Sequence, residues 1–421
     1  GFNFIMGFYL NFLGETRVSK LISLTILILF FYYIFNENFR VWYLSIFYLL
    51  AFIYVLIKNK KVVVNIPLVL FCLISFFTFS LSYYLFDRLD DIPPGGPYRT
   101  YKNIVNQYLW VIPLCFLPTI YSYFGYRVKN FFIILYIVIG FLMFYSWAVG
   151  FQLDFDRGLF AQFYNPIISY DIVFVSLSIV ALVFSFYLRG YWAYLLCSIS
   201  LLSLFIFILH GSRGTWLIVP FLLLFLILFY YKTQKKKLLF VGGAFLFFVI
   251  INAIIPNSPL FSRLDDFQND KNAIENQSYQ NSTGARLVMW ENAIELFEKH
   301  PLIGVSAYGV EQEQCRLAEQ GILPSCFQHK HNIFFQDLAA NGLIGLMGLI
   351  ISLLTPLMFF FSQFSSRNEL VRNLALAGFL FVFSFFLSGL TEYYLFFPYV
   401  TYIFFFITAS LMSFIILKNM K

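Results

Sequence analysis

Runs of apolar residues close to 20 in length recur along the whole chain, and most of them are separated by short polar segments. A membrane-spanning helix needs about 20 predominantly apolar residues. The pattern predicts twelve such helices, which cover 21–36, 41–57, 65–86, 104–124, 130–150, 164–188, 191–209, 214–231, 238–256, 333–361, 373–390 and 394–417. We therefore expect an all-α polytopic membrane protein.

One connection is much longer than the others and divides the chain into three parts. Residues 1–256 hold predicted spans one to nine, residues 257–332 form a large loop, and residues 333–421 hold spans ten to twelve. Long loops in compact proteins usually carry function. The sequence therefore directs attention to this loop and to the membrane face on which it lies.

Inside the loop, a helix is expected from about residue 285 to residue 299. Ser282 or Thr283 can cap its first turn, and it should end before Pro301. Four apolar residues recur at helical spacing, namely Leu287, Trp290, Ile294 and Phe297. Charged residues lie on the opposite face. Such an amphipathic helix could lie on the bilayer surface or against the bundle.

Composition and charge support this topology. The 421 residues are 60% hydrophobic and 12% charged, whereas a soluble domain carries about 25% charged residues. When the spans alternate from a cytoplasmic N-terminus, 16 of the 28 basic residues fall at inner ends, as the positive-inside rule requires. The net charge of +7 is thus a topology signal, and nothing indicates nucleic-acid binding.

Two of the five cysteines, Cys315 and Cys326, fall in the large outer loop. A disulfide that closes a short loop is expected if that side is oxidising, and two free thiols are the alternative. The other three fall in predicted spans, where cysteine packs as a small apolar residue.

A permanent cation stands at the edge of span eight, in the stretch HGSRG over residues 210–214. Arg213 holds its charge at any relevant pH and presents a planar fork that suits phosphate. An ionisable residue at membrane depth indicates function by default, and Ser212 could assist it. The alternative is that Arg213 reaches into lipid headgroups, but the flanking Gly211 and Gly214 favour a close ligand.

A second cation, Arg286, lies in the first turn of the predicted loop helix, where the helix dipole disfavours it. A nearby anion would offset this cost. The alternative is an exposed arginine paired with a glutamate.

Four polar residues, His329, Lys330, His331 and Asn332, stand where the large loop re-enters the membrane. A histidine is the usual general base near neutral pH, and Asp337 could support the same cavity. Two histidines could bind a metal, but no cysteine or acid has matching spacing in the sequence, so we expect none. Interfacial polar residues without chemistry are the remaining alternative.

Three further acidic residues carry weaker signals. Asp154 and Asp156 match the D-x-D pattern of metal-dependent glycosyltransferases, but two acids in an outer loop are common. Asp171 falls inside span six and is expected to pair with a cation or a hydroxyl. The candidate groups share one membrane face, and together they suggest transfer of a sugar from a lipid diphosphate to a hydroxyl, with arginines in place of a metal.

At these residues the sequence resembles the O-antigen ligase (WaaL) family, within the O-antigen ligase/polymerase superfamily. Three motifs carry the resemblance in chain order over about 205–350, namely Ser212-Arg213-Gly214, then Gly284-Ala285-Arg286-Leu287 with His300-Pro301-Leu302-Ile303-Gly304, then His331-Asn332 followed by Gly342-Leu343-Ile344-Gly345. The first half of the chain matches only in hydropathy and in Arg99 and Lys102 of an outer loop.

The resemblance implies a twelve-helix bundle in the inner membrane of a Gram-negative bacterium, with its active site facing the periplasm. The donor would be undecaprenyl-diphosphate-linked O-antigen and the acceptor a sugar hydroxyl of lipid A–core. The reaction would be inverting and would need no cofactor or metal. Arg213 and Arg286 match the arginines that hold the diphosphate, and His331 matches the histidine that activates or orients the acceptor.

Three other activities stay open. An O-antigen polymerase would use the same donor but extend another lipid-linked glycan, and a protein O-oligosaccharyltransferase would modify a protein. A transporter would place its ionisable residues near the bilayer midplane and often shows two repeated halves, neither of which the sequence displays. The glycan, the acceptor sugar and the oligomeric state are not encoded in any pattern we recognise.

Overall fold

The computed structural model describes residues 16–35, 42–86, 109–153, 167–205, 210–216, 218–254 and 280–420, together with the single residues 159, 268, 272 and 275. The backbone of Arg213 belongs to this set, and its side chain does not. Predictions on Arg99, Lys102, Asp154 and Asp156 lie outside the described residues.

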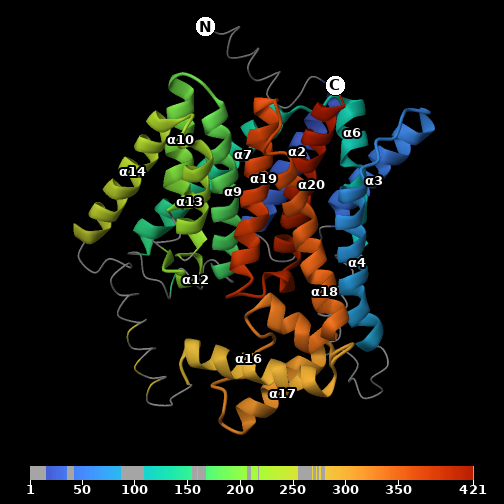
Figure 1. Cartoon of the computed structure of the whole chain (residues 1–421), viewed down its shortest axis with the longest axis vertical. Helices are drawn as coiled ribbons and strands as arrows, with labels where there is room; N and C mark the ends of the chain where they lie inside the picture. Colours follow the sequence, from blue (N-terminus) through green and yellow to red (C-terminus); the bar gives the residue numbers. More distant parts are fainter. Residues whose placement is uncertain are drawn as a thin grey trace.

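The described residues form helices and no strand (Figure 1). In chain order these are α2 (Arg17–Phe35), α3 (Trp42–Ile57), α4 (Ile66–Phe86), η1 (Ile112–Phe116), α6 (Leu117–Phe124), α7 (Val128–Gln152), α9 (Ile167–Tyr187), α10 (Tyr191–Leu204), α12 (Arg213–Trp216), α13 (Ile218–Tyr230), α14 (Lys235–Ile254), α16 (Ser282–Lys299), α17 (Ser306–Glu319), α18 (Ile333–Ser362), α19 (Glu369–Ser388), η2 (Tyr394–Phe396) and α20 (Pro398–Asn419).

The all-α prediction is confirmed, and the chain is an integral membrane protein. Each of the twelve predicted segments contains helix in its described part. Among the described residues, five helices are long and apolar enough to cross a membrane, namely α7, α9, α18, α19 and α20. Several other apolar helices are shorter, so the count of twelve spans and their orientation stay predictions.

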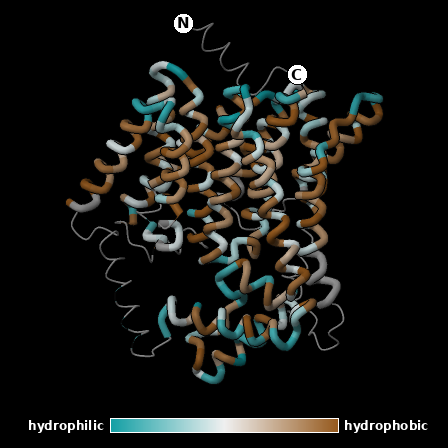
Figure 2. Tube along the Cα trace, in the orientation of Figure 1, coloured by the Kyte–Doolittle hydropathy of each residue, from teal (hydrophilic) through white to brown (hydrophobic). Residues whose placement is uncertain are grey.

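The centre of the bundle is formed by α9 and α20, in which 94% of the span window is buried. Several of their buried polar side chains form hydrogen bonds within the bundle, where no water is available as a partner. Ser176 of α9, for example, shares a hydrogen bond of 2.6 Å with Ser384 of α19. Hydrophobic residues make up most of the bundle helices, and hydrophilic residues gather at the ends of these helices (Figure 2). Both kinds are present on α16 and α17.

The described part of the predicted helix over 104–124 is helical over Ile112–Phe124, but in two pieces. The chain forms the short helix η1 and then α6, and each has a proline in its first two positions, Pro113 and Pro118. Proline lacks an N–H and clashes with the preceding turn, so it starts a helix more readily than it continues one.

The loop helix forms as α16, but two details of its prediction are wrong. Its N-cap is Asn281, whose Oδ1 accepts a hydrogen bond of 2.6 Å from Gly284 N, and neither Ser282 nor Thr283 has that role. Leu287 and Ile294 are exposed. The buried face is the neighbouring one, made up of Gly284, Ala285, Met289, Asn292, Ala293 and Leu296.

This choice of face follows from what α16 packs against. The helix lies with α17 below the bundle in Figure 1 and contacts the first turns of α18. Ala293 and Leu296 form a small core there with Val310, Ala339 and Ala340. Alanine on both sides lets helix backbones approach closely, so shape and not hydrophobicity alone selects the face.

Candidate functional site

The segment before α18 is fixed to the turn between α19 and α20. Asn332 is the N-cap of α18, and its Oδ1 accepts a hydrogen bond of 2.8 Å from Phe334 N. Its Nδ2 donates to Leu390 O at 2.9 Å. The next N–H, of Ile333, donates to Gly389 O at 2.8 Å. These bonds bring together the polar stretch before α18 and the polar turn after α19.

His331 and Glu392 meet at this junction. His331 Nδ1 lies 3.1 Å from Glu392 Oε1 and 3.2 Å from Oε2. Burial raises the pKa of the Glu392 carboxyl, but the hydrogen bond from His331 and nearby positive charge outweigh it and bring the pKa to about 2. Glu392 is therefore ionised and can only accept, so His331 Nδ1 is the donor. The backbone of His331 has a φ of 49°, which an L-residue rarely adopts.

Arg286 belongs to the same cluster. The residue is half-buried in the second turn of α16, one turn later than predicted. Its positive charge adds to burial in lowering the pKa of His329, and to the hydrogen bond from His331 in lowering the pKa of Glu392. A buried carboxylate, Glu392, is thus among the neighbours of this arginine, and binding of a diphosphate by Arg286 stays a prediction. The structure brings together two of the three residues on which the predicted mechanism depends, Arg286 and His331.

His329 is buried beside His331, with the ring centroids 4.4 Å apart. Burial, and then the charge of His331, lower the pKa of His329 to about 3, so its ring is neutral at physiological pH. Its Nδ1 lies 3.9 Å from Glu392 Oε1. The ring also contacts the aromatic rings of Tyr393 and Phe396.

These residues could hold a metal ion, contrary to one argument from the sequence. Three ligand atoms lie within 4.8 Å of one another, one each from His329, His331 and Glu392. The sequence argument required an acid near the two histidines in the chain. The fold supplies one from the turn after α19. Two imidazoles and a carboxylate are a donor set that suits zinc and similar ions.

Lys330 connects the segment before α18 to α16. It is completely buried, and its Nζ donates a hydrogen bond of 2.6 Å to Asn292 Oδ1. Trp290 Nε1 donates to the Lys330 carbonyl at 3.0 Å, and the Trp290 ring stacks on Phe335. Burial lowers the pKa of Lys330 to about 7, although Glu313 and Glu295 oppose this.

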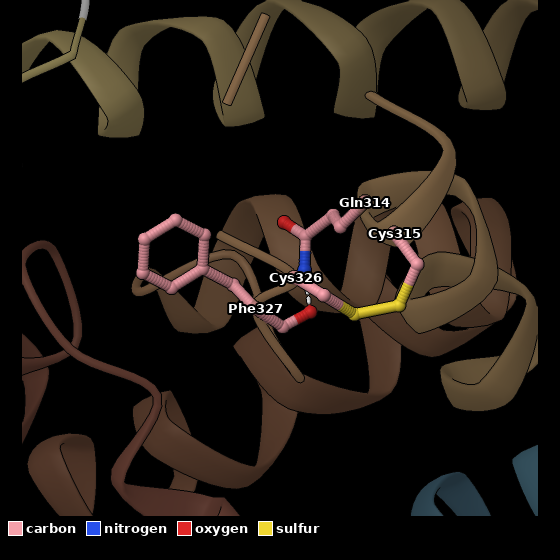
Figure 3. The surroundings of a disulfide bond; sticks show 4 residues. All are labelled: Gln314, Cys315, Cys326 and Phe327. Carbon is pink, nitrogen blue, oxygen red and sulfur yellow. Dashed lines mark hydrogen bonds between the residues drawn. A yellow bond between two sulfur atoms is a disulfide. The ribbon is translucent and has the colours of Figure 1, made fainter. Parts of the chain in front are cut away.

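The predicted disulfide between Cys315 and Cys326 is present (Figure 3). It joins α17 to the segment that leads into His331. Next to it, Gln314 Nε2 donates to Phe327 O at 2.6 Å. The Phe327 ring lies 5.6 Å from the His331 ring, edge to face. The disulfide therefore restrains one wall of the His331 environment.

The start of the HGSRG stretch is held by Asp171 of α9. His210 Nδ1 lies 2.6 Å from Asp171 Oδ1, and the Ser212 hydroxyl donates to the other carboxylate oxygen. All three residues are buried. The prediction that Asp171 pairs with a cation or a hydroxyl is confirmed, because it bonds a hydroxyl. Ser212 thus bonds Asp171, and the prediction that it assists a ligand is untested.

Arg213 begins the short helix α12 immediately after this pair. The following residue, Gly214, contacts the turn that carries Glu392. A Cβ added to Gly214 would lie 3.0 Å from Thr391 Oγ1. Arg213 therefore directly precedes a residue that lies against Thr391, the neighbour of Glu392. In Figure 1, α12 lies at the end of the bundle that is nearer to α16.

The turn after α16 interlocks with a break in α18. Gly342 has φ 62° and ψ −156° inside that helix, so the next N–H groups lose their helical partners. Leu343 N instead donates to Pro301 O at 2.8 Å, and Ile344 N donates to Leu302 O at 3.2 Å. A Cβ on Gly342 would collide with the backbone at Leu302. Glycine at 342 therefore permits the turn after α16 to approach the backbone of α18 closely.

Asp337 does not bond His331. Its Oδ1 accepts a hydrogen bond of 2.5 Å from Asn341 Nδ2, one turn along α18. Burial raises the pKa of Tyr393 and Tyr394, and Asp337 adds to the rise, so Asp337 lies near the turn that carries Glu392. A role for Asp337 in the same cavity stays a prediction.

The sequence analysis missed Glu392 as a functional candidate. One signal could have identified it. Glu392 is the one carboxylate in the short connection between two strongly apolar predicted spans, 373–390 and 394–417. Such a residue at membrane depth indicates function by default.

Residues 198–350 match the sequence model of a family described as O-antigen ligase. The predicted resemblance is therefore confirmed over this interval, which contains Arg213, Arg286 and His331. Glu392 lies beyond it.

Two curated relatives share part of the sequence. An uncharacterized protein of Haemophilus influenzae is 25% identical over 250 residues, which are 58% of this chain and 61% of that protein. A protein named O-antigen ligase in Escherichia coli K12 is 30% identical over 133 residues, 30% of this chain and 31% of that one. The chain thus spans about three fifths of the first relative's length and about a third of the second's.

Proposed function

We propose that this chain, whose residues 198–350 match the O-antigen ligase family, is itself an O-antigen ligase. It would transfer the glycan of an undecaprenyl-diphosphate-linked donor to a sugar hydroxyl of lipid A–core, on the periplasmic face of a Gram-negative inner membrane. The observation that carries the proposal is the hydrogen-bonded pair of His331 and Glu392 with the charge of Arg286 beside it.

In this mechanism His331 removes the proton from the acceptor hydroxyl. Its Nδ1–H is held by the Glu392 carboxylate, so the lone pair of Nε2 is available as the base. Glu392 also stabilises the imidazolium that forms. The pair works as histidine and carboxylate do in other general-base arrangements. His331 and Glu392 would already be in position for this step before the donor binds.

The acceptor oxygen attacks the anomeric carbon of the donor from the face opposite the diphosphate. The new glycosidic C–O bond forms as the C–O bond to the diphosphate breaks, and the configuration inverts. The polyprenyl diphosphate leaves with the electron pair of the broken bond. Arg213 and Arg286 stabilise its charge by bidentate hydrogen bonds, and Arg99 and Lys102 of an outer loop are further candidates for this role.

Several neighbouring residues would act by positioning. Asn332 fixes the start of α18 relative to the Glu392 turn, and Ser212 fixes the turn before Arg213 through Asp171. His329 packs against the ring of His331. We include Asp337 because it lies near that turn.

We propose that transfer needs no metal, because two arginines supply the positive charge that a metal would give to the leaving group. His329, His331 and Glu392 form a possible metal site, so this point requires a test. Transfer by purified protein should be unaffected by EDTA. Clear inhibition that added Zn²⁺ or Mn²⁺ reverses would replace the base mechanism by a metal mechanism, and would direct attention also to Asp154 and Asp156.

The proposal is tested by separating donor binding from transfer. His331→Ala should retain binding of the lipid diphosphate donor and lose about 10²–10⁴-fold in transfer rate, the usual contribution of a general base. Arg316→Ala is the control, because Arg316 is exposed on α17 and pairs with Glu313. Full transfer by His331→Ala would remove His331 from the mechanism.

Two alternatives use the same donor chemistry. An O-antigen polymerase would add the glycan to a second lipid-linked glycan, and a protein O-oligosaccharyltransferase would add it to a protein hydroxyl. A glycosylated pilin-like acceptor would indicate the latter. The family match supports the ligase and polymerase readings alike, and the name of the Escherichia coli relative favours the ligase.

A further inference from the structure

A cavity lies at the end of the bundle opposite α16 and α17. Its volume is about 730 Å³, within the range of about 300–1,000 Å³ that is usual for ligand sites. It opens where α6 ends and α7 begins, and the last turns of α9 and α20 close its sides. Figure 1 shows the labelled ends of α6 and α20 on the side of the molecule away from α16. The cavity is therefore separate from the His331 site.

The cavity is positively charged. Arg127, Lys129 and Lys418 all line it, and no carboxylate does so among the described residues. Arg127 is also the N-cap residue of α7 and provides no side-chain cap. The positive end of the helix dipole therefore adds to the three side-chain charges. An anion is the complementary ligand.

The remaining lining is apolar and aromatic. Phe184 and Leu188 from the end of α9 face Phe414 and Leu417 from the end of α20. Tyr121 stacks on Phe414 at 5.1 Å between ring centroids. A small hydrated anion gains nothing from such a surface, whereas an acyl chain buries apolar area on it.

Four of the helices around the cavity are membrane-spanning candidates, namely α7, α9, α19 and α20, and the cavity lies at their ends. This is the depth at which the headgroups of a bilayer meet the acyl chains. Basic pockets between spanning helices at that depth bind anionic headgroups. The positive-inside pattern of the sequence assigns this end to the cytoplasmic leaflet.

We propose that this cavity binds an anionic phospholipid, with the phosphate between Arg127, Lys129 and Lys418 and the first acyl carbons against Phe184 and Phe414. The site is independent of the proposed glycan transfer. The shared chemistry is a phosphate ester, which could belong to a lipid or to a soluble metabolite. The apolar half of the lining favours the lipid.

The test uses the full-length protein, delipidated in detergent and then mixed with phosphatidylglycerol or phosphatidylcholine. Native mass spectrometry counts the retained lipids, and thermal melting reports stabilisation. The wild type should retain phosphatidylglycerol preferentially and melt at a higher temperature with it. Arg127→Ala/Lys418→Ala should lower this preference by about fivefold for each cation removed, since each is worth about 1 kcal/mol near an anionic headgroup.

The matched control is Lys235→Ala/Lys236→Ala, because these exposed lysines start α14 at the same end of the bundle and do not line the cavity. It should keep the preference of the wild type. If Arg127→Ala/Lys418→Ala does not fold, Lys129→Gln/Lys418→Gln makes the same comparison with smaller changes.

Three results would overturn the proposal. The wild type could show no preference for phosphatidylglycerol, or the control could lose the preference as completely as the cavity variant. Alternatively, glycerol 3-phosphate without an acyl chain could stabilise the protein as well as phosphatidylglycerol does, in which case the ligand is a soluble phosphate ester. None of these measurements depends on transfer activity, so their outcome is distinguishable from a failure of the proposed function.

Discussion

The imidazole of His331 and the carboxylate of Glu392 form a hydrogen bond of 3.1 Å across 61 positions of the chain. Glu392 is almost completely buried, and the backbone on both sides is fixed by hydrogen bonds from Asn332 and Ile333. The pair is thus held in place before any substrate arrives, and its contribution can be measured separately from binding.

Glu392→Gln should lower kcat by about 10²-fold or more and leave the KM for the donor nearly unchanged. The amide keeps the shape of the carboxylate but cannot hold a protonated imidazole, so the base is lost while the fold remains. Steady-state transfer kinetics measure both values. Glu319→Gln, at an exposed position at the end of α17, is the control, and a Glu392→Gln variant with normal kcat would show that the pair is structural.

Arg286→Ala should abolish transfer while the protein still inserts in the membrane. Arg286→Lys should also impair it, because lysine keeps the charge but lacks the bidentate fork. Donor binding and transfer rates measure the two effects, with the exposed Arg316→Ala as control. The same pair of changes at Arg213 should give the same result. Full activity of both alanine variants would eliminate the diphosphate clamp.

Cys315→Ser/Cys326→Ser should loosen the segment that leads into His331. A disulfide closing a loop this short stabilises by about 2–3 kcal/mol, and its loss frees Phe327 from one wall of the site. We expect faster proteolysis between α17 and α18, together with a transfer rate reduced by several-fold. Dithiothreitol should affect the wild type in the same way and leave the double variant unchanged. Equal sensitivity of the two proteins would show that the reductant acts elsewhere.

The buried Lys330 should make stability depend on pH. Its pKa is about 7 in the folded protein and 10.5 in an ordinary environment, so between these values the unfolded chain binds a proton that the folded chain does not. Stability should therefore rise with pH over this window, by at most about 1.4 kcal/mol per pH unit. Melting in detergent at pH 7, 8 and 9 should show this rise in the wild type and a smaller one in Lys330→Met.

One result would contradict this prediction for Lys330. A Lys330→Met variant with the same pH slope as the wild type would mean that another group causes the dependence. The variant also loses the bond to Asn292, so its absolute melting temperature carries less information than the slope.

Local pattern predicted most of the helices, and it failed where tertiary packing decides. The positions of α7, α9, α18, α19 and α20 follow from continuous apolar runs, since lipid requires a self-satisfied backbone. The buried face of α16 did not follow, because it is selected by the small residues of α18 that it meets. Hydrophobic spacing alone pointed to Leu287 and Ile294, which are exposed.

The candidate site shows the same division. Arg286 and His331 could be recognised because the first is a cation near a predicted helix start and the second lies at a predicted membrane edge. Glu392 could not be assigned to them, because no local pattern relates a turn after α19 to the start of α18. The break at Gly342 is similar. Its glycine was visible, but the turn at Pro301 and Leu302 that replaces its helical hydrogen bonds is a property of the folded chain.

The central claim is that this protein transfers a lipid-linked glycan to lipid A–core. Its most direct test is an assay with purified protein in nanodiscs, undecaprenyl-diphosphate-linked glycan as donor, and lipid A–core either present or absent. The account predicts that glycan appears covalently on lipid A–core, that undecaprenyl diphosphate is released in equal amount, and that no product forms without the core. Growth of longer lipid-linked glycan in the absence of lipid A–core would contradict it.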